Sequence, residues 1–88
     1  MLIDNFYFNY FQLLVSLQNY VVQAKNEEVC CESLRVLANI SRHREFLKFI
    51  EKLRFTEALI ILLNYNNKDI VFYAMGVLIN LVNDEEIR

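Results

Sequence analysis

The amino-acid sequence predicts an all-α fold, a segment of a helical solenoid with about two repeated units, from three observations. Apolar residues recur at spacings of three and four through most of the 88 residues, which is the periodicity of amphipathic helices. A single glycine and no proline leave few of the residues that form β-hairpin turns. The windows SLRVLANIS (33–41) and AMGVLINLV (74–82) share Val-Leu-x-Asn in register, 41 residues apart, and such repetition is typical of stacked helical arrays.

The first two helices are expected in residues 1–40. The stretch MLIDNFYFNYFQLLVSLQNYVV predicts a core helix, because polar residues interrupt it too often for a membrane span and it lacks the basic start of a signal peptide. The second helix is predicted to have Asn26 as its N-cap and to run to about Ile40.

Three more helices are expected in the rest of the chain, so that one period consists of a short, a medium and a long helix. Apolar periodicity predicts the first two at 45–52 and 55–65, with Thr56 as N-cap of the latter. The last is predicted to have Asp69 as its N-cap and to end near Asn83.

These helices predict three parts of the chain. Residues 1–42 form a partial first unit, residues 43–83 a complete unit, and residues 84–88 the start of a truncated next one. A unit with apolar residues on more than one side must stack on neighbours, and about three units are normally needed for independent stability. The chain is therefore expected to be a piece of a longer solenoid or a member that borrows a partner's surface.

Four segments resemble the armadillo repeat, and a period near 40 is typical of armadillo or HEAT arrays. Residues 33–40 and 74–81 are similar to its third helix, A-x-W-A-L-x-N-L, and residues 11–17 and 58–63 to its second. The resemblance implies an α-solenoid that binds proteins through its third helices. The run VCCESLRVLANISRHREFLKFI resembles a ciliary and flagellar member of the family, which implies a non-enzymatic, cytoplasmic role in assembling the axoneme, within a larger assembly of axonemal or ciliary transport proteins.

The chain departs from the family pattern at three places. Arg35 and Gly76 stand where peptide-carrying members have tryptophan. The family glycines between the first and second helices are missing, with residues 52–55 in their place. The first unit is also longer by five residues, and an insertion at 20–25 is expected to bulge from one edge of the stack.

The candidate partner-binding residues are Arg35, Asn39, Arg42 and Asn80. An asparagine amide on a third helix can donate to and accept from the backbone of an extended peptide, and the period aligns Asn39 with Asn80. Arg35 lies one turn before Asn39 and, with Arg42, could receive an acidic segment. The alternatives are that the amides only fix the stack and that the arginines are solvated or pair with nearby glutamates.

Charge and cysteine content limit the classes of partner and the cellular compartment that are expected. Residues 35–54 carry six basic and two acidic side chains in a chain of net charge −2, so the basic cluster is a solvated face or meets an acidic protein; neither nucleic acid nor membrane is expected as a partner. The adjacent Cys30 and Cys31 offer no disulfide framework, which indicates a reducing compartment. At least one should be a buried apolar residue, although the start of a helix could lower a thiol pKa.

No catalytic, metal or cofactor site is predicted, so the chain is not expected to be an enzyme. His43 is the only histidine, and one glycine cannot form a phosphate-binding loop. A different function class is a small helical bundle that dimerises through its N-terminal helix and has no peptide groove. That helix carries an aromatic stripe, which consists of Phe6, Tyr7, Phe8, Tyr10 and Phe11. The stripe either binds a partner or packs on the helix that contains Phe46, Phe49 and Ile50.

Overall fold

The computed structural model describes the backbone of residues 2–23 and 26–84, and among their side chains those of residues 9, 11–21 and 26–84. All regular structure in these residues is helical, which confirms the all-α prediction and is compatible with a solenoid. The five helices are α1 (Leu2–Gln23), α2 (Glu27–Ile40), α3 (Arg44–Lys52), α4 (Phe55–Leu62) and α5 (Lys68–Asn83).

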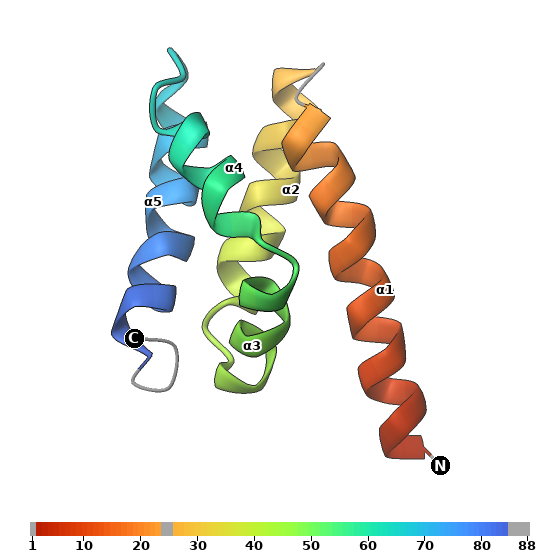
Figure 1. Ribbon diagram of the computed structural model, residues 1–88. Coiled ribbons are helices and arrows are strands. Elements are labelled where there is room, and N and C mark those ends of the chain that lie inside the picture. Colours follow the sequence, from red (N-terminus) through yellow and green to blue (C-terminus); the bar gives the residue numbers. More distant parts are fainter. Residues whose placement is uncertain (1, 24–25, 85–88) are drawn as a thin grey trace.

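Helices α1 and α5 form opposite edges of the molecule, and α2 lies between them (Figure 1). The long helices α2 and α5 share the most extensive contact, α2 also packs along α1, and α4 packs along α5. The short α3 follows α2 and leads into α4. The boundaries of the predicted units at residues 42 and 83 stay predictions, and residues 85–88 of the third part lie outside the described residues.

The two long helices begin with the same cap, 41 residues apart. The Asn26 side chain accepts hydrogen bonds from the backbone N–H groups of Glu28 and Val29, and Asn67 does the same for Asp69 and Ile70. The prediction of Asn26 is confirmed and that of Asp69 is wrong. Asp69 lies in the first turn of α5, where its negative charge interacts favourably with the positive end of the helix dipole.

The link from α3 to α4 has no side-chain cap, so the prediction of Thr56 is also wrong. Arg54 occupies the N-cap position in the left-handed region, with φ 60° and ψ 42°. This conformation favours glycine, the residue the family pattern has here. Helix α4 ends at Leu62, earlier than predicted, because the N–H groups of residues 63–65 bond to the carbonyl three residues back, which tightens the last turn.

Helix α1 continues to Gln23, so the expected bulge at residues 20–25 is wrong as far as residue 23; residues 24 and 25 lie outside the described part. Leu14, Leu17 and Val21 follow one another at spacings of three and then four residues, and all three side chains are buried. The additional residues therefore lengthen the buried stripe of α1 instead of leaving the stack.

One apolar core joins all five helices, from Leu14 of α1 to Leu81 of α5. The Phe11 ring meets Phe49 of α3 edge to face, with 6.0 Å between ring centroids. The side chains of Phe6, Tyr7, Phe8 and Tyr10 lie outside those described, so only Phe11 of the aromatic stripe is placed, and it packs inward. No helix of the described residues has the length and apolar character needed to cross a membrane.

Candidate functional site

A groove between α2 and α5 brings the four candidate residues together. Its cavity of about 260 Å³ has one wall from α2 and the turn after it, and the other from α5. The α2 side supplies Arg35, Ala38, Asn39 and Arg42, and the α5 side supplies Phe72, Tyr73, Gly76, Ile79 and Asn80. The sequence therefore located the polar lining of this groove, while the partner-binding role of these residues stays a prediction.

Asn80 is part of a short hydrogen-bond chain that ties α5 to the end of α2. Its Nδ2 donates to Ser41 Oγ at 2.8 Å, and Ser41 Oγ donates to the Ala38 carbonyl oxygen at 2.8 Å. Ser41 is 1% exposed, so its hydroxyl is held away from water and needs both partners. One amide hydrogen of Asn80 thus serves to hold the two helices together, which is the alternative role that the sequence allowed for this amide.

Asn39 differs from Asn80 despite the 41-residue relation. It is exposed, and within the described part of the chain its side chain makes no hydrogen bond. The reason is positional: Asn80 lies against the Ser41 hydroxyl at the end of α2, whereas no described residue offers a hydrogen bond to the Asn39 side chain. The Asn39 amide consequently keeps both its donor and its acceptor groups for a partner.

The two candidate arginines also differ. Arg35 pairs with Glu32 at 2.9 Å, one turn away on α2, as its alternative interpretation expected. Both side chains are more than half exposed, so this pair contributes little to stability and can be exchanged for another carboxylate. Arg42 is exposed and forms no ion pair among the described residues. Of the two arginines in the groove, Arg42 is therefore the one without a carboxylate partner among the described residues.

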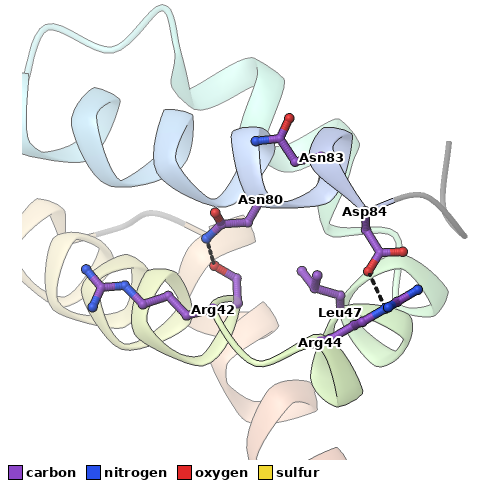
Figure 2. A pocket seen from close by; sticks show the side chains of 7 residues that line it. Arg42, Arg44, Leu47, Asn80, Asn83 and Asp84 are labelled. Carbon is purple, nitrogen blue, oxygen red and sulfur yellow. Dashed lines mark hydrogen bonds and ion pairs between the residues drawn. The ribbon is translucent and has the colours of Figure 1, made fainter.

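A second cavity of about 410 Å³ adjoins the groove and shares Arg42 and Asn80 with it (Figure 2). Arg44 Nε lies 3.4 Å from Asp84 Oδ2, and the Asp84 side chain is 5% exposed. This ion pair joins the start of α3 to the end of α5. The Arg42 and Arg44 guanidinium groups extend toward opposite ends of the cavity.

Sequence reasoning missed the α5 wall of the groove and the Arg44–Asp84 pair. The signal for the wall was present, because Phe72, Tyr73, Gly76 and Ile79 lie within one or two turns of Asn80 on α5. A Cβ added at Gly76 would meet nothing within 4 Å, so the position of the family tryptophan is an open hollow here. The Arg44–Asp84 pair has no periodic signal, since it links two helix ends that only the fold brings together.

The cysteines are not activated. Burial is the main cause that raises the pKa of Cys30, and Cys31 and Glu27 raise it further. Burial and then the nearby Asp69 carboxylate raise the pKa of Cys31. Desolvation of the thiolate thus outweighs the effect of the helix dipole, and the prediction of a lowered pKa is wrong for both cysteines. The predicted buried apolar role is confirmed for Cys30.

No histidine, cysteine, aspartate or glutamate cluster that could hold a metal occurs among the described residues. His43 precedes α3, and its ring lies edge to face against Phe46, with 6.1 Å between centroids. Among the described residues, no cysteine or acidic side chain forms a hydrogen bond with the His43 ring, as a partner of a general base would.

Comparison with known proteins finds a similarity to an armadillo-repeat protein. No family model matches the chain, and no solved structure matches it. The chain is 35% identical over 65 residues to armadillo repeat-containing protein 2 of Mus musculus, a match that covers 74% of this chain and 8% of that protein. The chain thus spans less than a tenth of its relative's length. The similarity is weak, and it agrees with an armadillo-like helical segment.

Proposed function

We propose that this chain is a segment of an armadillo-like α-solenoid that binds another protein, without enzymatic activity, through the groove between α2 and α5. The observation that carries the proposal is that Arg35, Asn39, Arg42 and Asn80, chosen from the repeat pattern, line one cavity. The partial similarity to an armadillo-repeat protein supports the same class of function.

The lining of the groove favours an extended peptide segment with an acidic and an apolar residue. Arg42 offers a charge-assisted hydrogen bond to a carboxylate, and the Asn39 amide can pair with peptide backbone. On the other wall Phe72 is 71% exposed and Ile79 is 50% exposed, and the hollow above Gly76 leaves room for an apolar side chain. The charged groups of one wall and the exposed apolar groups of the other would determine which peptide side chains face each wall.

The proposal extends to the cellular setting. Residues 29–50 resemble a ciliary and flagellar member of the armadillo family, and on that resemblance we place the chain in the cytoplasm and cilium, within an axonemal assembly. Its partners are then axonemal or ciliary transport proteins with acidic segments.

Fluorescence polarisation with a library of labelled ten-residue peptides, each with acidic and apolar residues, tests the groove. Arg42→Glu should weaken the best peptide by about tenfold or more, because it replaces the free cation with a like charge. Lys52→Glu is the matched control, since it makes the same charge change on α3 away from the groove. Asn39→Ala should also weaken binding and leave folding intact.

Equal binding by wild type, Arg42→Glu and Asn39→Ala would remove the groove from consideration. Binding that both charge reversals weaken equally would indicate general attraction to the basic residues 35–54 and would also contradict a defined site.

A further inference from the structure

The second cavity, at the end of α5, continues the peptide groove. The two share Arg42 on one wall and Asn80 on the other, so a peptide that passes between these residues reaches both. The second cavity is the larger, with about 410 Å³ against about 260 Å³ for the groove. It therefore has room for a further side chain of a bound peptide.

The α5 wall of the two cavities sets the length of peptide that they can hold. It runs from Phe72 to Asp84, a separation of 12 residues, which is about 18 Å at the rise of an α-helix. An extended chain advances by about 3.3 Å per residue, so about five or six peptide residues would span both cavities. The part from Asn80 to Asp84 corresponds to about two of them.

The accessible charge of the second cavity is positive. Arg42 and Arg44 are both exposed, and their guanidinium groups extend toward opposite ends of the cavity (Figure 2). The lining also contains the Asp84 carboxylate, but the Asp84 side chain is 5% exposed, against 63% for that of Arg44. A ligand in the cavity therefore meets the cation of this ion pair and little of its counterion.

The ion pair also holds the Arg44 cation in place. Arg44 Nε lies 3.4 Å from Asp84 Oδ2, which ties the arginine side chain to the end of α5. A side chain that is already held loses less conformational entropy when a ligand binds than a freely rotating one. Asn83 lies one turn beyond Asn80 on the same wall, is exposed, and offers an amide donor. These groups suit a carboxylate.

We propose that the second cavity binds a second acidic side chain of the same peptide, beside Arg44, while Arg42 receives the first. This inference rests on the proposed peptide groove and adds a requirement to its ligand, namely two acidic residues at a fixed separation. The wall from Asn80 to Asp84 spans about two extended residues, and the two guanidinium groups diverge, so this separation should be about two to four residues.

Fluorescence polarisation with the full 88-residue chain tests the second acidic position. The starting peptide is the best binder with one acidic residue, and a second aspartate is placed one to six residues from the first, on either side. At the separation that reaches Arg44 the second aspartate should tighten binding by about fivefold, because it adds a partly exposed ion pair. At the other separations the gain should stay below about twofold.

Asn83→Asp is the variant that tests the location. It adds a carboxylate to the second cavity and leaves the Arg44–Asp84 pair in place, so the gain from the second aspartate should disappear. Asn64→Asp is the matched control, since it makes the same change at an exposed asparagine in the turn between α4 and α5, outside the lining of both cavities. This variant should keep the gain. Far-UV circular dichroism checks that both keep their helices, and the peptide series needs no variant at all.

The outcomes separate this inference from the groove on which it rests. An equal gain at every separation would show general attraction to the basic residues 35–54 and would overturn the second position. A gain at one separation that survives Asn83→Asp would also overturn it. If no second aspartate tightens a peptide whose binding still depends on Arg42, the second position is wrong and the groove stands. If no peptide binds, or if Arg42→Glu has no effect, both proposals fail.

Discussion

Helices α2 and α5 share an N-cap, a length of about four turns and the Val-Leu-x-Asn motif, yet they bury different faces. Leu34 of α2 is 0% exposed, whereas Met75, its equivalent, is 43% exposed. The relation reverses for Val36 at 41% and Val77 at 0%. Helix α2 has α5 on one side, and α5 has α2 on the opposite side, so the same pattern is covered from different directions. Order in the stack, more than local sequence, decides which apolar residues form the core.

The largest expected difference between α2 and α5 comes from truncating Leu34 and its equivalent, Met75. Leu34→Ala should lower the free energy of unfolding by about 3 kcal/mol, because it leaves a cavity among fully buried side chains. Met75→Ala should change it by less than about 1 kcal/mol in the monomer, because the side chain is already in contact with water. Urea unfolding at low protein concentration measures both values. Equal losses would mean that Met75 is covered in solution.

The caps provide a comparison in which the repeats should behave alike. Asn26→Ala and Asn67→Ala each remove the acceptor for two backbone N–H groups, and each should cost about 1 kcal/mol of unfolding free energy. Substitution by Asp is the control, since a carboxylate also caps. Thermal unfolding of the four variants would contradict the shared cap if one alanine variant matched the wild type.

The two asparagines of the shared motif should separate in a third comparison. Asn80→Ala removes the donor to the buried Ser41 hydroxyl and should destabilise the protein by about 1 kcal/mol. Asn39→Ala should have almost no effect on unfolding, because the side chain is exposed and makes no hydrogen bond in the described part of the chain. In an Asn80→Ala/Ser41→Ala double mutant the cost of Asn80→Ala should shrink; strictly additive effects would argue against the bond.

The smallest expected effect lies at the link between α3 and α4. Arg54→Gly should stabilise the protein by about 0.5 kcal/mol, because glycine adopts the left-handed conformation at φ 60° without a steric penalty, partly offset by its greater freedom in the unfolded chain. Arg54→Ala separates loss of the charge from relief of the backbone and should not stabilise. Chemical unfolding of both variants against wild type measures this difference.

Much of the groove was predictable because it depends on local periodicity. Repetition at 41 residues aligned Asn39 with Asn80, and helical spacing placed Arg35 one turn before Asn39 on α2. Asn67 was equally available as a cap, since it stands 41 residues after Asn26, and the repeat identifies it over Asp69. The Ser41–Asn80 bond was not predictable, since it depends on the distance between two helices that are not adjacent in the chain.

The sequence by itself determined the five helices and their order, the repeat of the long helix and most of the polar residues of the groove. These follow from apolar periodicity, capping side chains and a fixed offset, all of which act over a few residues. Only the tertiary structure decided that Arg54 takes a left-handed conformation, that residues 20–23 extend α1, and that α5 leaves one apolar face open. An amphipathic pattern specifies which side of a helix prefers to be buried, but the neighbouring helices determine whether it is.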